Sequence, residues 1–243
     1  MTAVLEVEGL TKRFGGVAAV DGCSLAVSEG TVTALIGPNG SGKTTLFNLI
    51  TGYMKPDAGS VVFAGRRVRR SNPTALCRRG LTRTFQQARV FGSLTLVENM
   101  IAAIQQPRRS LFQPAAPRPH REHAVELLEE FGLAGLKDAR ADQLSFGQRK
   151  LLEFAAVLMG KPQLVLLDEP TSGVNPVMVE TMERHIRELH AGGLTLFIVE
   201  HAMPVVMRLC DPVIVLDRGC KIAEGSAAQV QRDPLVLDAY LGS

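Results

Sequence analysis

Residues 37–44 read GPNGSGKT and match the pattern G-x-x-x-x-G-K-[ST] at every fixed position. In this pattern, glycines let successive backbone N–H groups turn inward around phosphate oxygens, and the following helix offers its positive N-terminal end. Lys43 is expected to reach the β- and γ-phosphates of a nucleotide, and the Thr44 hydroxyl to bind Mg²⁺. A buried strand predicted over 31–36 precedes the loop and a helix predicted over 44–53 follows it, which is the context the pattern requires. We therefore predict that these residues bind the nucleotide: Gly37, Pro38, Asn39, Gly40, Ser41, Gly42, Lys43, Thr44 and Thr45.

Polar side chains follow two further predicted strands. Asp168 and Glu169 come directly after an apolar stretch at 164–167, where unpaired carboxylates are costly unless they face a charged ligand. We expect Asp168 to bind Mg²⁺, directly or through water, and Glu169 to orient and deprotonate the attacking water. His201 follows the predicted strand 194–199 and is expected to contact the γ-phosphate and the same water. The alternative for the two carboxylates is a surface turn, and the other four histidines show no metal-ligand spacing.

The remaining periodicity predicts an α/β fold. Apolar and polar residues alternate over 4–27, and again in a hairpin at 59–68, which is typical of antiparallel strands. Later in the chain, apolar strands alternate with helical patterns, which favours a mostly parallel sheet covered on both faces. The later elements are strands at 164–167, 194–199 and 213–216, a helix at 176–190, and a strand at 220–223 that pairs with its predecessor.

Between these regions the pattern is helical from about residue 73 to residue 160. Residues 105–120 hold four prolines and are expected to form a loop within it. We predict a single domain in which residues 87–160 form an inserted helical subdomain, while residues 1–86 and 161–243 form the core with its β-subdomain.

Composition excludes several classes of protein. The chain has 243 residues, 46% of them hydrophobic, and a formal net charge of +3, which describes a globular protein and not a disordered one. Its densest basic run has no interleaved aromatic residues, so we predict a solvated face or a membrane-surface contact, and no nucleic-acid partner. The run consists of Arg66, Arg67, Arg69, Arg70, Arg78, Arg79 and Arg83.

The cysteines and the apolar stretches bear on the compartment. The four cysteines form no CxxC pair, which indicates a reducing compartment with mostly buried, free thiols. We expect no secretory signal, because Glu6 and Glu8 interrupt the apolar residues near the N-terminus. No stretch contains the about 18 consecutive apolar residues that a membrane helix needs. Any membrane role is therefore expected to come through a partner.

A second motif carries a family resemblance. Residues 144–148 read LSFGQ and resemble the LSGGQ signature of ABC ATPases, with Phe146 at the third position. The resemblance implies the ABC ATPase fold, with a P-loop NTPase (RecA-like) core, an N-terminal antiparallel β-subdomain and an inserted α-helical subdomain. It also implies that two ATP molecules lie between two subunits, each held by the phosphate loop of one subunit and by Ser145, Gly147 and Gln148 of the other. Ser145 and Gly147 are expected to begin a helix whose N-terminus attracts anions.

Two further site residues follow from the same resemblance. Phe14 stands where an aromatic residue stacks on adenine, the alternative being a core aromatic. Gln86 matches the glutamine that binds the metal, senses the γ-phosphate and connects to the membrane partner, and Gln87 competes for that role. Asn175 and Ala156 depart from the pattern common in the family, which puts local contacts in doubt but not ATP binding.

The sequence also resembles one branch of the family, the ATPases of branched-chain amino acid importers, and the longer of their two types. The stretches that carry this resemblance are 12–16, 84–86, 98–100, 173–176, 200–203 and 239–242. It implies integral-membrane permease subunits, a periplasmic or extracellular binding protein, and a second ATPase subunit that is either a copy or a sibling. It also implies a peripheral position at the cytoplasmic face of the inner (cell) membrane.

Several alternatives stay open at this stage. Urea or amide importers and lipopolysaccharide-type exporters have similar ATPases. A soluble nucleic-acid-associated ABC ATPase would usually carry long coiled coils or two ATPase units, and this chain shows one unit and no sustained heptads. A nucleotide-gated scaffold without hydrolysis is disfavoured by Glu169 and His201.

Overall fold

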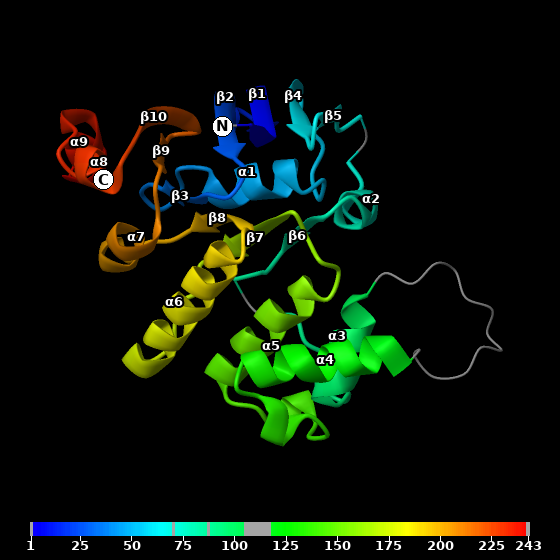
Figure 1. Cartoon of the computed structure of the whole chain (residues 1–243). Coiled ribbons are helices and arrows are strands. Elements are labelled where there is room, and N and C mark those ends of the chain that lie inside the picture. The colour runs from blue at the N-terminus through cyan, green and yellow to red at the C-terminus, as the bar shows by residue number, and fades with distance from the viewer. Residues whose placement is uncertain (1, 70, 87, 105–117, 242–243) are drawn as a thin grey trace.

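The computed structural model describes residues 2–69, 71–86, 88–104 and 118–241, and it contains two β-sheets with helices between and around them (Figure 1). A four-stranded sheet has the order β2-β1-β4-β5, and a six-stranded sheet has the order β10-β9-β3-β8-β7-β6. The strands are β1 (Ala3–Phe14), β2 (Val17–Ser28), β3 (Val32–Ile36), β4 (Ala58–Phe63), β5 (Arg66–Arg67), β6 (Leu81–Arg83), β7 (Leu164–Asp168), β8 (Thr195–Val199), β9 (Val213–Asp217) and β10 (Cys220–Gly225). The helices are α1 (Lys43–Ile50), α2 (Pro73–Arg78), α3 (Leu96–Ala103), α4 (Arg118–Glu130), α5 (Phe146–Leu158), α6 (Pro176–Ala191), α7 (Met203–Leu209), α8 (Ala227–Val230) and α9 (Pro234–Leu241), with 3₁₀ turns at Ala134–Leu136 and Ala141–Gln143.

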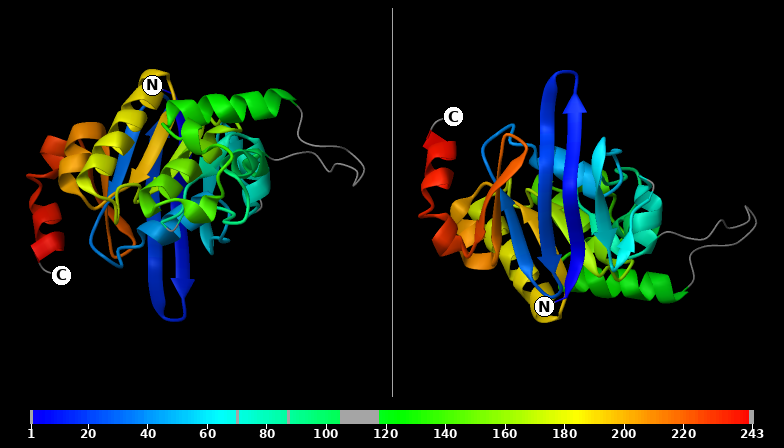
Figure 2. Two further views of the ribbon diagram at one scale, coloured as in Figure 1. Left: turned by 90° about the horizontal axis from the view of Figure 1, so that it is seen from below. Right: turned by 90° about the horizontal axis from the view of Figure 1, so that it is seen from above.

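Helix α1 lies between the two sheets and fills one of two hydrophobic cores. This core joins β1, β2 and β4 to α1 and to one face of the six-stranded sheet. The second core covers the opposite face with α5, α6 and α7 and extends to α3 and α4. Figure 2 shows the C-terminal helices α8 and α9 on the side of the molecule away from α4.

The central strands have the complete burial that is typical of a parallel sheet. Every residue of β3, β7 and β8 is buried, as expected for strands covered on both faces. Strands β6, β7, β8, β3 and β9 run parallel, and β10 closes the edge antiparallel to β9. Because parallel strands end at the same edge, the loops after β3, β6, β7 and β8 all leave the sheet on one side, where ligands bind in α/β folds.

These findings confirm the predicted fold and correct some of its details. Helix α1 ends at Ile50, three residues before the predicted end. Strand β6 lies inside the stretch where the predicted pattern is helical, because three residues are too few to show a period and their pairing with β7 decides the structure. The first turn of α4 contains residues 118–120, which were predicted to be loop, and residues 105–117 lie outside the described residues.

The structure shows the burial of the four cysteines and whether any described helix could span a membrane. Cys23 and Cys210 are buried, but Cys77 is half-buried and Cys220 is exposed, so the expectation of mostly buried thiols holds for two of the four. Burial raises the pKa of Cys23 to about 11 and that of Cys210 to about 12. Within the described residues, no helix is long and apolar enough to cross a membrane. The division into a core and a helical subdomain at residues 87 and 160 stays a prediction.

Phe197 on β8 provides a test of how the sheet holds α1. Its side chain is fully buried, and its ring centroid lies 5.1 Å from that of Phe47 on α1. We expect Phe197→Ala to lower the free energy of unfolding by about 3–5 kcal/mol in urea denaturation. Phe91→Ala, at a side chain that is 61% exposed, should change it by less than about 0.5 kcal/mol. Equal effects of the two substitutions would contradict this packing.

Candidate nucleotide-binding and hydrolysis site

The loop between β3 and α1 needs glycine at two positions for steric reasons. Gly37 has φ +151° and Gly42 has φ +103°, both rare for other residues. A Cβ atom would lie 2.0 Å from the Leu216 carbonyl oxygen at Gly37, and 2.2 Å from the Ala19 carbonyl oxygen at Gly42. Neighbouring strands therefore press the loop so closely that only glycine fits.

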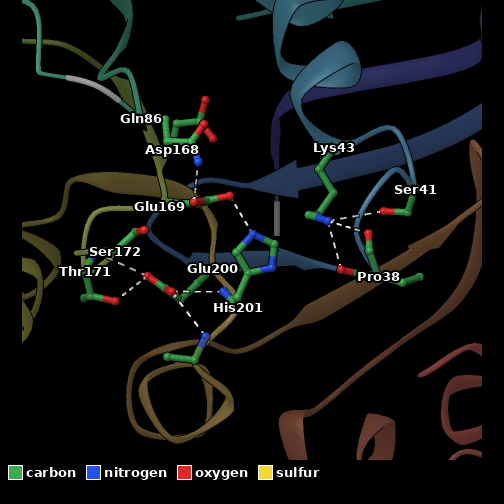
Figure 3. A network of polar contacts seen from close by, with 12 residues as sticks. Pro38, Ser41, Lys43, Gln86, Asp168, Glu169, Thr171, Ser172, Glu200 and His201 are labelled. Atoms are coloured by element: carbon green, nitrogen blue, oxygen red, sulfur yellow. Dashed lines mark hydrogen bonds and ion pairs between the residues drawn. The ribbon is translucent and has the colours of Figure 1, made fainter. Parts of the chain in front are cut away.

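Lys43 projects back into this loop. Its ammonium donates to the carbonyl oxygens of Gly37 and Pro38, both at 2.8 Å, and lies 3.4 Å from the Ser41 hydroxyl (Figure 3). Burial lowers the pKa of Lys43, and the nearby carboxylates of Glu169 and Asp168 act in the opposite direction. The loop thus combines a cation with the start of helix α1.

The start of α1 is open to an anion. Gly42 is its N-cap and provides no side-chain hydrogen bond, and the first turn has no acidic residue. The first N–H groups of a helix need acceptors, and a phosphate supplies them well. Thr44 is exposed and Thr45 is half-buried at this end, so the Thr44 hydroxyl is accessible to a bound ion.

Glu169 is the meeting point of three loops. Its carboxylate accepts a hydrogen bond from the Gln86 side-chain amide at 2.8 Å and lies 2.5 Å from Nε2 of His201 (Figure 3). Its backbone has φ +50°, an uncommon conformation for a residue with a side chain, and its N–H donates to the Val199 carbonyl at 2.9 Å. Strained backbone of this kind concentrates at functional positions. Gln86, Glu169 and His201, three of the expected site residues, therefore lie together, while Gln87 lies outside the described residues.

Asp168 has a partner that the sequence analysis missed. Its Oδ2 lies 2.6 Å from Nη2 of Arg83, and both side chains are only 4% exposed. The other terminal nitrogen of Arg83 donates to Asn48 of α1 at 2.7 Å. The expectation that the whole arginine run is a solvated face or surface contact is thus wrong for Arg83, because the end of β6 faces the end of β7.

The residues present fit a nucleotide-bound Mg²⁺. The ion prefers oxygen donors and commonly takes one or two from the protein, with the rest from phosphates and water. The accessible Thr44 hydroxyl and the Asp168 carboxylate are oxygen donors of this kind, and Gln86 adds an amide.

Glu200 links the loops after β7 and β8, and it was also missed from the sequence. This buried carboxylate accepts from the Thr171 hydroxyl at 2.7 Å and from the Thr171 backbone at 3.4 Å. It also accepts from the backbone N–H groups of His201 at 2.9 Å and Ala202 at 3.2 Å (Figure 3). Through these hydrogen bonds, Glu200 holds the backbone at His201 in position.

The signature residues lie on a different element. Ser145 caps α5: its hydroxyl accepts from the Gln148 N–H at 3.3 Å, and the Gln148 side chain accepts from the Ser145 N–H at 2.9 Å. A Cβ atom at Gly147 would lie 2.9 Å from the Met178 side chain. Among the hydrogen bonds of the described residues, none joins Ser145, Gly147 or Gln148 to the phosphate loop. The helix start predicted from the motif is confirmed.

Phe14 also stands apart from the loops at the strand ends. It is the last residue of β1, and it is 50% exposed, which disfavours the alternative of a core aromatic. The Lys12 ammonium lies 5.8 Å from its ring centroid. The exposed ring of Phe14 is available for stacking.

Asn175, one of the departures from the family pattern, is the N-cap of α6. Its side chain accepts a hydrogen bond from the Met178 N–H at 2.9 Å.

The steric demand at Gly42 gives a direct test of the loop. Gly42→Ala would introduce strain of about 1–3 kcal/mol at this backbone, and we expect ATP affinity to fall about tenfold or more in a fluorescent-nucleotide titration. Gly135→Ala is the matched control, since that position has open space and no positive φ. An unchanged affinity in the Gly42 variant would argue against nucleotide binding at this loop.

Comparison with known proteins identifies the family of the chain. The ABC transporter family model matches residues 20–172, and the model for the branched-chain amino acid ATP-binding cassette transporter matches residues 220–243. Over 98% of both chains, the sequence is 37% identical to the high-affinity branched-chain amino acid transport ATP-binding protein BraF of Pseudomonas aeruginosa. It is 38% identical to the probable branched-chain amino acid transport ATP-binding protein LivG of Methanocaldococcus jannaschii, covering 98% of this chain and 97% of that one.

Solved structures show the same fold. A nucleotide-free ATP-binding cassette from an ABC transporter superposes with a TM-score of 0.90 at 36% identity, with full coverage of both chains. The ADP conformation of another ATP-binding cassette of an ABC transporter gives a TM-score of 0.89 at 37% identity, also with full coverage. The chain therefore belongs to the ABC transporter family, as an ATP-binding protein of the branched-chain amino acid transporter (LivG/BraF) type.

Proposed function

We propose that this chain is the ATP-hydrolysing subunit of a branched-chain amino acid importer and that Glu169 is its catalytic base. The observation that carries the proposal is the position of the Glu169 carboxylate, held between Gln86 and His201 at the sheet edge that also carries the phosphate loop. The names of the relatives BraF and LivG support branched-chain amino acids as the transported class.

The proposed reaction divides the work among the loops. Glu169 accepts a proton from a water molecule, which attacks the γ-phosphorus while the bond to ADP breaks. Gln86 and His201 orient the Glu169 carboxylate and that water. Lys43 exchanges its carbonyl acceptors for phosphate oxygens, and with the start of α1 it stabilises their negative charge. Mg²⁺, held at Thr44 and Asp168, would supply further neutralisation of the phosphates.

Completion of the site requires a second ATPase subunit, which is either a copy or a sibling of this chain. Ser145, Gly147 and Gln148 begin α5, and among the hydrogen bonds of the described residues none joins them to the loop that carries Lys43. We infer that this helix start binds the γ-phosphate of the nucleotide held by the partner, in line with the affinity of helix N-termini for anions. Phe14, on the β1–β2 hairpin, is proposed to stack on adenine.

A hollow of about 190 Å³ is the proposed contact with the permease. It lies between the end of α1, α2, β6 and the ends of α3 and α5, and the exposed Tyr53 lines it. Arg83 lies against this hollow and holds Asp168, so a permease helix seated there would be one side chain away from the proposed metal site. The proposal includes a position of the chain at the cytoplasmic face of the membrane, with an external binding protein that delivers the amino acid.

The role of Glu169 is open to direct measurement. Glu169→Gln should lower the rate of ATP hydrolysis by about a hundredfold or more, because the amide cannot accept the proton, while ATP affinity stays close to that of the unchanged chain. Glu130→Gln, an exposed substitution on α4, should leave both values unchanged. Turnover in the Glu169 variant near that of the control would remove Glu169 from the role of base.

Transport assays address the substrate class. Cells that carry the intact chain or its Glu169→Gln form would be given labelled leucine and labelled urea in parallel. We expect leucine uptake to fall to background with the variant while urea uptake stays unchanged. Loss of urea uptake alone would move the chain to urea import, and an effect on neither compound would contradict the proposed import function.

A further inference from the structure

Two charged side chains of α5 point at the loops of the catalytic site, although the reaction does not use them. Lys150 and Glu153 are both buried, and their spacing of three residues puts them on the same side of the helix. Buried charges are costly unless several hydrogen bonds compensate them. The compensating partners here are backbone groups of two loops.

Lys150 holds the loop that follows β7. Its ammonium donates to the carbonyl oxygens of Glu169 and Ser172, both at 2.8 Å, and to that of Pro170 at 3.3 Å. The first of these bonds acts on the residue with the unusual φ of +50°. Lys150 therefore stabilises the backbone conformation that aims the Glu169 carboxylate.

Glu153 holds the loop that follows β6. Its Oε1 accepts hydrogen bonds from the backbone N–H groups of Phe85 and Arg89, both at 3.2 Å, on either side of Gln86. Burial raises the pKa of Glu153 to about 7, while the two N–H groups, Lys150 and Arg89 act in the opposite direction. Both bonds end on a single oxygen, so a carbonyl oxygen at the same place could also accept them.

A contact within the site closes these links into a ring. Gln86, in the loop held by Glu153, donates to the carboxylate of Glu169, in the loop held by Lys150, at 2.8 Å. The ring thus runs from α5 through one loop, across the Gln86–Glu169 hydrogen bond and back to α5 through the other loop.

We propose that Lys150 and Glu153 are positioning residues for ATP hydrolysis, which fasten the loops of Glu169 and Gln86 to the helix that begins at Ser145. The proposal rests on the function proposed above for Glu169 and Gln86. It predicts that the signature end of α5 and the catalytic side chains of the same subunit move together. When the nucleotide held by the partner subunit binds at Ser145, α5 then transmits a change of position to Glu169.

The test compares two substitutions at Glu153. Glu153→Met removes the acceptor and should lower kcat for ATP about tenfold or more, with KM changed by less than about threefold, because misplaced catalytic groups affect turnover more than binding. Glu153→Gln keeps a carbonyl oxygen for the two N–H groups and should recover most of the lost turnover. Glu130→Gln serves as the exposed control on α4.

Amide hydrogen exchange on the full chain gives a readout independent of catalysis. Peptides that cover residues 84–90 should exchange faster in Glu153→Met than in the unchanged protein, while peptides that cover β8 should not change. The Gln variant should restore slow exchange at Phe85 and Arg89. Lys150→Met should likewise lower kcat, with faster exchange confined to residues 169–172.

Each outcome bears on the proposal. Unchanged kcat and exchange in Glu153→Met would overturn it, and so would equal losses in the Met and Gln variants. If the Met variant does not fold, exchange at Phe85 and Arg89 in the unchanged protein decides, because unprotected amides there would contradict the two hydrogen bonds. If Glu169→Gln retains hydrolysis, the proposed base role fails, whereas loss of protection at residues 84–90 would still establish the link between Glu153 and the loop.

Discussion

The parallel pairing of β7 with β8 is the constraint on which the site depends. Its register sets Asp168 opposite Val199, so Glu169, directly after β7, and His201, two residues after the end of β8, emerge at the same edge of the sheet. The N–H of Glu169 donates to the carbonyl of Val199, which fixes the turn at the exact point where the strands end. A shift of one residue would send these side chains to the opposite face of the sheet. The burial of every residue in both strands opposes such a shift.

Around this pairing, buried charges support the loops of the proposed catalytic site by binding backbone groups. Glu200 holds the loops after β7 and β8 together, and Glu153 and Lys150 hold the loops after β6 and β7 to α5. Arg83 joins Asp168 to α1. Each of these charges would destabilise the fold if it were unpaired, and each has at least two partners here. The hydrolytic geometry and the stability of this edge of the sheet therefore depend on the same contacts.

The site residues that could be proposed from the sequence are those whose chemistry is local. Gly37 and Gly42 follow from the needs of a phosphate loop, and Glu169 and His201 from their places after apolar strands. Arg83, Glu200 and Glu153 could not be predicted, because each depends on a partner far along the chain. Strand β6 was missed for a related reason, since three residues show no period and only the neighbouring β7 makes them a strand. An acid before His201 was visible in the sequence, but its role requires the position of Thr171.

We propose that the ends of β3, β6, β7 and β8 form one site for the γ-phosphate, with Glu169 as its base. An experimental structure of the Glu169→Gln chain with ATP and Mg²⁺ tests this most directly. We expect the phosphates in the loop of residues 37–44, the ion beside Thr44 and Asp168, and residue 169 against the water that faces the γ-phosphate. A nucleotide bound elsewhere would rule this site out, and so would a residue 169 side chain turned away from the γ-phosphate while another group holds that water.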